Sequence, residues 1–315
     1  MVWGEVMPSI LSNIFRKTKL LAGVQFEGNV IRILVIDKEN YTTYNQPVEY
    51  ILSEEEKTQI PEVIKRELLG LNINEPLDAV IGLPLSVSLI KNLKLPKMDK
   101  KDLLEAIEWN IKEEMQTIQG ETTYDFDIIG EEDDMYNIIV VVAKKTDVQR
   151  LEDIEKTTGI KIIHIDSNPI SLINIASLQK EKKGAIAGDD NTVCALYIDY
   201  DISYIVLYQN GLSTETFSFK LKDFKTFEES EPELTKLINE INYFFLTVSE
   251  PSVIYLAGPI LEYPDVKEYI QSKFIGKFAF IDIDPAEILG INYAGDKYPG
   301  VYAIPFGLIY RGLEE

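Results

Sequence analysis

Two similar strand–turn–strand patterns, one near the beginning of the chain and one beyond its middle, constrain the fold more than any other feature. The first has apolar runs at 20–26 and 30–36 around a tight turn at 27–29, whose Gly and Asn tolerate positive φ. The second pattern, at 193–219, adds a third strand. Strand and helix patterns follow both hairpins. The sequence therefore predicts a duplicated α/β architecture in which mixed sheets carry helices on their outer faces.

A change of composition separates the two halves. Residues 178–191 are charged, small and turn-forming, which indicates a connection between domains. The domains that we predict are an N-terminal amphipathic segment (1–19), a first domain (20–180), a linker (181–191) and a second domain (192–315). The clearest predicted helix spans 99–116, where apolar residues recur at four-residue spacing behind a capping aspartate.

Composition excludes several classes of function. The net charge of −21 disfavours a nucleic-acid partner, because a phosphate backbone needs a basic face. One cysteine, Cys194, and one histidine, His164, leave too little for a disulfide, a zinc site or a Cys–His pair. No apolar run is long enough to span a membrane. The segment 10–19 is amphipathic and basic, so a membrane-surface anchor, a helix packed on its own protein and a loose tail stay open.

Three segments resemble, in order, the nucleotide-binding landmarks of actin-like ATPases. Residues 23–32 correspond to the superfamily motif Gly-x-Asp-x-Gly-Ser followed by Val-Lys. Residues 198–211 correspond to its Asp-x-Gly motif, and residues 254–260 to its Gly-Gly motif. Within the superfamily the chain resembles the PilM-like proteins of type IV pilus assembly, through "IGLPLSVSLIKNLKLPKMDKKDLLEAIEWNIKEEM", "IDSNPISLIN", "LTKLINEINYFF" and "YAIPFGLIYRGL". The resemblance implies an actin-like, ribonuclease H-like duplicated two-domain fold. It also implies a small subdomain inserted at about 84–163 and a reduced outer subdomain in the second half.

The resemblance also places a nucleotide cleft, but its motifs are altered. Gln25 replaces the family's Asp, while Glu27, Asp201 and Pro259 replace glycines. A phosphate-binding turn needs free N–H groups, and proline has none. We therefore expect a pseudo-ATPase without catalytic residues or cofactor, although ATP with magnesium held by Asp199, Asp201 and Glu27 stays open. The cleft positions implied by the resemblance are Gln25, Phe26, Glu27, Gly28, Asn29, Asp199, Asp201, Gly258 and Pro259.

The implied function is that of a non-catalytic scaffold in a type IV pilus or related secretion platform. PilM-like proteins bind the cytoplasmic N-terminal peptide of PilN, an inner-membrane protein, so the resemblance implies a PilN-like partner, a link to the motor and a cytoplasmic position at the inner membrane. An oligomer stays open. Trp109 is either a partly buried surface residue or an interface anchor. The implied partner groove is lined by Leu83, Pro84, Leu85, Leu104, Ile107 and Trp109.

Two other functions are weighed against the scaffold. A working ATPase or sugar kinase of the same superfamily needs a catalytic aspartate, for which Asp166 is the candidate; its competing role is to cap the helix that begins near Asn168. A cell-division protein of the FtsA type needs a C-terminal amphipathic membrane helix, whereas this sequence ends in "RGLEE".

Overall fold

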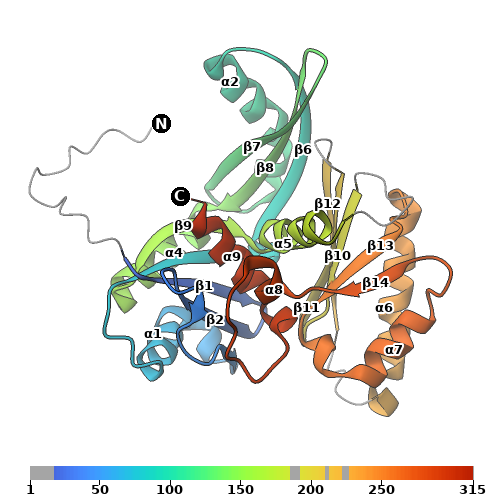
Figure 1. The fold of residues 1–315 in the computed structure, drawn as a ribbon. Helices are drawn as coiled ribbons and strands as arrows, with labels where there is room; N and C mark the ends of the chain where they lie inside the picture. The colour runs from blue at the N-terminus through green and yellow to red at the C-terminus, as the bar shows by residue number, and fades with distance from the viewer. Residues whose placement is uncertain (1–17, 185–191, 210–212, 222–226, 315) are drawn as a thin grey trace, which may run out of the picture.

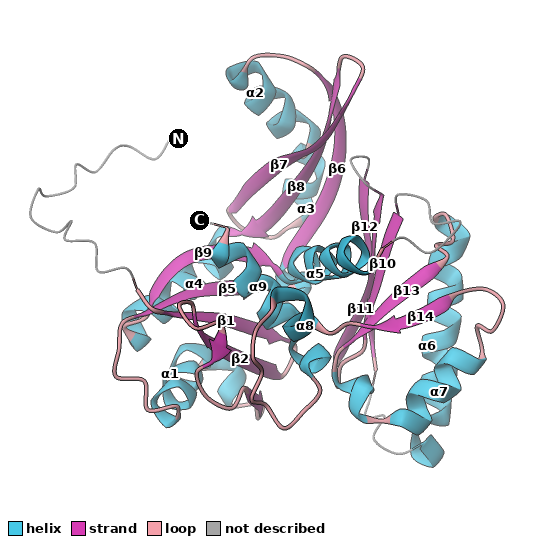
Figure 2. Cartoon of the chain, viewed as in Figure 1, coloured by secondary structure: helices cyan, strands magenta, loops and turns pink. Residues whose placement is uncertain are grey.

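The computed structural model describes residues 18–184, 192–209, 213–221 and 227–314, in three sheets and the helices around them (Figures 1 and 2). The strands are β1 (Leu20–Glu27), β2 (Val30–Asp37), β3 (Thr42–Thr43), β4 (Val48–Ile51), β5 (Leu77–Leu83), β6 (Ser88–Pro96), β7 (Thr122–Glu132), β8 (Met135–Lys144), β9 (Lys161–Ser167), β10 (Thr192–Tyr197), β11 (Ile202–Gln209), β12 (Ser213–Lys220), β13 (Val253–Ala257) and β14 (Ala279–Asp282). The α-helices are α1 (Ile60–Gly70), α2 (Lys100–Asn110), α3 (Lys112–Thr117), α4 (Lys145–Thr158), α5 (Asn168–Lys183), α6 (Phe227–Thr247), α7 (Pro264–Ser272), α8 (Pro285–Leu289) and α9 (Ala303–Leu313).

The first sheet has the order β3-β2-β1-β5-β9, with β4 also paired to β2. Strand β1 is antiparallel to β2 and parallel to β5, and β5 is parallel to β9. All residues of β2 and β5 are buried, because helices cover both faces of the sheet. This explains why these strands are almost continuously apolar instead of alternating. Helices α1 and α4 supply Val63, Ile64, Leu151 and Ile154 to one face.

The second sheet repeats the first. Its order is β12-β11-β10-β13-β14, with β10 antiparallel to β11, parallel to β13, and β13 parallel to β14. Helices α6 and α7 cover its outer face through a core that includes Leu237, Ile241 and Ile270. The predicted duplication is therefore confirmed at the level of strand order and direction.

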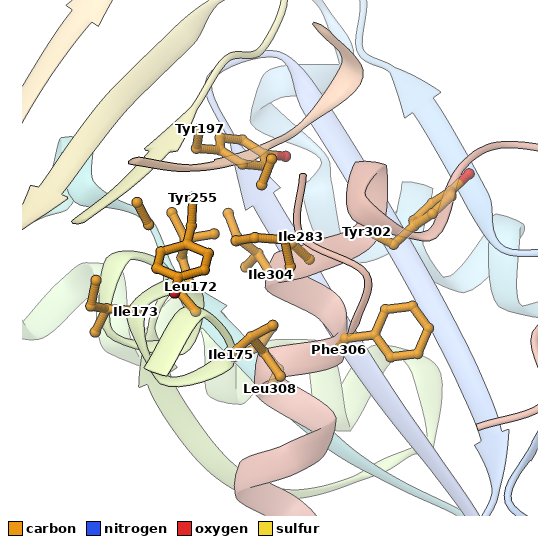
Figure 3. Packing of buried hydrophobic residues seen from close by; sticks show 14 of the residues in the cluster. Leu172, Ile173, Ile175, Tyr197, Tyr255, Ile283, Tyr302, Ile304, Phe306 and Leu308 are labelled. Atoms are coloured by element: carbon orange, nitrogen blue, oxygen red, sulfur yellow. The ribbon is translucent and has the colours of Figure 1, made fainter. Parts of the chain in front are cut away.

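Helices α5 and α9 fill the space between the two sheets, and each packs on the half to which it does not belong in sequence. Helix α5 follows the last strand of the first sheet but contacts β10 and β11, whereas α9 ends the second half and contacts β1 and β5. Leu172 on α5, and Ile304 and Leu308 on α9, lie in one core with Tyr197 and Tyr255 from the second sheet (Figure 3). One shared core therefore joins the halves.

A third sheet, in the order β6-β8-β7, stands apart from the other two with α2 and α3 on one face (Figure 1). It has its own core, which includes Leu103, Ile107 and Ile111. The strands and helices of this unit span 88–144, whereas α4 packs into the core of the first sheet. The predicted domain bounds, including the insertion at about 84–163, stay predictions.

The helix predicted at 99–116 is two helices. Asp99 caps α2 as expected, since its carboxylate accepts hydrogen bonds from the N–H groups of Lys101 and Asp102. The helix is interrupted at Ile111, whose φ of −96° and ψ of 4° are not helical. Ile111 is fully buried, so it anchors the join between α2 and α3.

No helix among the described residues is long and apolar enough to cross a membrane. Most of the predicted N-terminal segment (1–19) lies outside the described residues, as do most of the linker (181–191) and part of the polar stretch 222–232.

Candidate functional site

The three segments that resemble nucleotide-binding landmarks meet where the two halves touch. Gln25 in β1 donates a hydrogen bond to the hydroxyl of Tyr197 in β10 (3.0 Å). The turn residue Gly28 has a φ of +58° and packs so closely on the carboxylate of Asp201 that a Cβ there would collide with it. Likewise, Gly258 has a φ of +95° and no room for a Cβ beside the backbone of Ile198. The structure thus brings the predicted landmarks together.

Arg32 in β2 joins the hairpins. Its side chain is fully buried. The guanidinium forks over the carboxylate of Asp199, with Nη1 2.5 Å from Oδ2 and Nη2 2.8 Å from Oδ1. Nη1 also donates to the Tyr197 hydroxyl (2.7 Å), and Nε donates to Oε2 of Glu49 in β4 (2.8 Å). A bidentate, charge-assisted fork of this kind is among the strongest polar contacts in proteins.

Charge is balanced around Arg32. The other oxygen of Glu49 pairs with Lys297 at 2.7 Å, so two carboxylates face two cations. Burial favours the neutral form of Arg32, but the Asp199 carboxylate overcomes it and holds the pKa of Arg32 well above its usual value. Burial also disfavours ionised Glu49, yet Arg32 and Lys297 lower its pKa. Both groups therefore stay charged, and the network is an ion cluster in the protein interior.

The third landmark, where Gly258 is retained and Pro259 replaces the second glycine, offers no free amide at either of these two positions. The N–H of Gly258 donates to the carbonyl of Gly300 (3.0 Å). Pro259 is buried, begins a short 3₁₀ turn and has no N–H. A loop that binds a nucleotide through backbone N–H groups has no free N–H group at these two residues.

Glu27 turns inward instead of facing the second hairpin. Its Oε2 accepts hydrogen bonds from the N–H of Leu85 (3.0 Å) and from Nδ2 of Asn168 (3.1 Å). The side chain is almost fully buried, and this burial raises its pKa to about 7. The Glu27 carboxylate thus takes backbone and amide donors of the kind that bind a phosphate.

Two of the three carboxylates of the alternative magnesium site are engaged by donors of the protein, and the site itself stays a prediction. Asp199 is engaged by Arg32, and Glu27 by Leu85 and Asn168. Over the part of the chain that the structure describes, no group of three or more His, Cys, Asp or Glu residues is placed to hold a metal ion. Of the other predicted positions, Phe26 packs on the core of the first sheet, and the carbonyl of Asn29 accepts a hydrogen bond from the N–H of Leu52.

Asp166, the candidate catalytic residue, binds the start of α5. Its carboxylate accepts hydrogen bonds from the N–H of Ser167 (2.8 Å) and the hydroxyl of Ser171 (3.1 Å). Burial raises its pKa. The N-cap residue of α5 is Ser167, and no side-chain cap hydrogen bond is formed at this helix end, so Asp166 contacts the start of α5 without capping it.

The six residues of the predicted partner groove do not line one groove. Leu83 is buried in the core of the first sheet, and Ile107 is fully buried under the third sheet, so the prediction that they face a partner is wrong for this structure. Leu85 packs against the shared core. Pro84 precedes a 3₁₀ turn beside it, and Leu104 is half-buried on α2. Only Trp109 is truly exposed, at 74%.

Sequence reasoning missed Arg32, Glu49 and Tyr197. A signal for Arg32 was present, because it is the only basic residue in the apolar run 30–36. A charge at a position that must be buried requires a partner of opposite charge. The identity of that partner, 167 residues away, carried no local signal.

Comparison with known proteins gives matches in structure only. No protein-family model and no curated protein matches the sequence. The structure of a PilM–PilN type IV pilus biogenesis complex is similar with a TM-score of 0.76 at 15% identity, over 94% of this chain and 99% of that one. The cytoplasmic domain of EpsL, an inner-membrane component of the Vibrio cholerae type II secretion system, is similar with a TM-score of 0.52 at 9% sequence identity. This match covers 94% of this chain and 95% of that one. The ethanolamine utilization protein EutJ from Carboxydothermus hydrogenoformans is similar with a TM-score of 0.50 at 10% sequence identity. This match covers 92% of this chain and 88% of that one.

The chain has the actin-like fold. The fold class implied by the sequence resemblance is confirmed, with the small inserted sheet in the first half. The ion pair of Arg32 and Asp199 joins the first hairpin to the second.

Proposed function

We propose that this chain is a non-catalytic scaffold of a pilus or secretion assembly platform, and that its own ion pair holds the interdomain cleft closed in place of a nucleotide. The observation that carries the proposal is the fully buried contact between Arg32 in the first half and Asp199 in the second. The similarity to PilM and to the cytoplasmic domain of EpsL, both parts of such assemblies, supports the assembly role.

Electrostatics explain why the cleft is unsuited to ATP. A triphosphate would have to displace the Arg32 guanidinium from Asp199, and separating a buried pair costs about 3–5 kcal/mol. It would also approach the carboxylates of Asp199, Asp201 and Glu49. Two like charges about 4 Å apart at an effective dielectric near 20 repel by about 4 kcal/mol, more than one charge-assisted hydrogen bond returns. We therefore propose that the chain is a pseudo-ATPase without a resident cofactor.

The proposed partner is the cytoplasmic N-terminal peptide of a PilN-like inner-membrane protein, by analogy with the PilM–PilN complex. Binding this peptide would hold the scaffold on the cytoplasmic side of the inner membrane and connect it to the motor. Of the six residues predicted to line its groove, Trp109 is the exposed one.

Isothermal titration of ATP with magnesium against the purified protein tests the closed cleft. We expect no binding heat from the wild type, with an ATP-binding actin-like protein as positive control. Micromolar affinity would refute the proposal and favour the working ATPase or kinase. A double variant, Glu27→Gly with Asp201→Gly, tests whether these two carboxylates contribute to the exclusion of ATP. Its control is Asp265→Gly with Glu268→Gly on α7, which removes the same amount of charge.

Co-purification tests the scaffold role separately. The protein is mixed with the N-terminal cytoplasmic peptides of PilN-like and EpsL-like candidates from pilus and secretion systems. Retention of one peptide, lost on scrambling its sequence, is the expected result. Failure with every candidate would remove the assembly role while leaving the closed cleft unaffected.

A further inference from the structure

Strand β7 is an open edge of the third sheet. It lies at one end of the order β6-β8-β7. The opposite edge, β6, is fixed to the second half, because the side-chain amide of Asn92 donates to the carbonyl of Thr214 and accepts from its N–H, both at 2.8 Å. Among the described strands, only β8 pairs with β7. An edge strand presents backbone N–H and C=O groups that can pair with another chain.

The outward backbone groups of β7 can be assigned. The N–H of Phe126 donates to the side chain of its neighbour Asp125 (2.9 Å) and so does not pair with β8. In an antiparallel ladder, outward and inward groups alternate along the strand. Tyr124, Phe126 and Ile128 therefore direct their backbone groups to the open side, where a further strand would bind and would replace the Asp125 carboxylate as the partner of the Phe126 N–H.

The exposed face of this edge is acidic. Asp125 and Asp127 are exposed, and within the described chain no lysine or arginine forms an ion pair with either. By contrast, the acids at the strand end are paired, Glu131 with Lys97 and Glu132 with Lys94. The two acids without an ion pair thus lie along the middle of the open strand, where Asp125 accepts only the backbone N–H of Phe126.

A hollow in which Trp109 and Met115 lie among three charged side chains adjoins the strand. It has a volume of about 460 Å³ and is lined by Glu105, Glu108, Trp109, Lys112 and Met115 of α2 and α3. The hydroxyl of Tyr124 in β7 donates to Glu108 (3.2 Å), so the hollow and the strand form one continuous surface. Trp109 is the large exposed aromatic residue of this surface.

We propose that β7 and the Trp109 hollow bind an extended basic segment of a partner protein. The segment adds a fourth strand beside β7, alternate lysine or arginine side chains pair with Asp125 and Asp127, and one apolar side chain fills the hollow. Strand addition of this kind takes affinity from the backbone and specificity from alternate side chains. Pairing with a second copy is disfavoured, because it would place the aspartates of the two β7 strands against each other. The proposal rests on the scaffold function for the existence of a partner, but not on the state of the cleft.

The probe is a fluorescently labelled peptide with alternating lysine and valine and one terminal leucine, added to the full chain. Fluorescence anisotropy should show binding that weakens with salt, and no binding of the matching glutamate–valine peptide. Asp125→Lys with Asp127→Lys should weaken binding by about tenfold or more, as expected for reversing charges in direct contact. The same change of net charge at Asp265→Lys with Glu268→Lys, on α7 of the second half, should leave binding within about twofold.

Two further measurements separate strand addition from simple charge attraction. Ile128→Pro removes an outward N–H but no charge, and should also weaken binding, with circular dichroism confirming the fold. Hydrogen exchange at the Tyr124, Phe126 and Ile128 amides should slow when the peptide is bound. Equal binding by the two charge-reversed variants, undiminished binding by Ile128→Pro, or unchanged exchange would overturn the proposal. If a PilN-like peptide binds the wild type and the Asp125→Lys with Asp127→Lys variant with equal affinity, the scaffold function stands and this site is wrong.

Discussion

Replacing Arg32 by methionine should destabilise the whole protein, because this side chain holds the two halves together at a site without water access. Methionine keeps much of the volume but removes one bidentate ion pair and the bonds to Tyr197 and Glu49. Glu49 keeps Lys297 as its partner, whereas Asp199 becomes a buried, unpaired carboxylate. Leaving one charge of a buried pair uncompensated costs about 3–5 kcal/mol. We expect a loss of that size in the free energy of unfolding, which is a large share of a typical domain's stability.

Arg66 provides a matched control. It also has three partners, with Glu56 and Glu67 as ion pairs and the Tyr50 ring at 4.6 Å, but its side chain is about half exposed. Exposed ion pairs contribute about 0–1 kcal/mol, so Arg66→Met should cost little. Urea unfolding followed by circular dichroism compares the two variants.

A double variant tests the cause of the loss. Asp199→Asn removes the charge that Arg32→Met leaves behind, so the two changes together should cost less than the sum of the separate costs, by about 1–3 kcal/mol. If Arg32→Met costs no more than Arg66→Met, or if the two changes are additive, the ion pair does not hold the halves together and the reasoning fails.

Three other predictions follow from the geometry. Burial raises the pKa of Glu27 from 4.5 to about 7, so folding favours its neutral form. The stability gained in this way is complete below pH 4.5 and is lost as the pH rises through 7. It amounts to about 3 kcal/mol, at 1.36 kcal/mol per unit of pKa shift. Glu27→Gln should flatten the pH dependence of urea unfolding over this window, and an unchanged slope would contradict the burial. Asn92→Ala should cost about 1–2 kcal/mol and speed hydrogen exchange at the N–H of Thr214, whereas unchanged exchange would show that β6 is not held to β12 there. Ile107→Ala should lower the free energy of unfolding by about 2–5 kcal/mol, and Trp109→Ala should lower it by less than about 1 kcal/mol, as measured by thermal unfolding. Equal losses in the two variants would mean that Trp109 is a core residue.

Much of the fold could be predicted because its strands are buried on both faces. Almost continuous apolar runs such as 20–26 and 30–36 mark such strands directly, and the turn at Gly28 marks their connection. The duplicated layout then followed from repeating the pattern. The interruption at Ile111 was missed because the four-residue spacing continues through it, and only the backbone angles reveal that the helix stops.

The candidate site was predicted less completely, for two physical reasons. The altered turns at Glu27 and Asp201 are local features, whereas the contact between Arg32 and Asp199 depends on packing between distant hairpins. The predicted partner groove failed because apolar residues at helical spacing signal burial without saying what buries them. Ile107 is covered by its own small sheet, not by a partner.

The exchange of α5 and α9 between the halves has a consequence for synthesis on the ribosome. The chain emerges from its N-terminus, so β1 and β5 leave the ribosome long before α9, the helix that covers one of their faces. Domains usually fold as units, N-terminal first, during synthesis. Here the first sheet must wait with an uncovered apolar face until α9, including Ile304 and Leu308, has been made. A chain that stalls before α9 would therefore expose the interior of its first half, and a nascent-chain binding chaperone would find its target there.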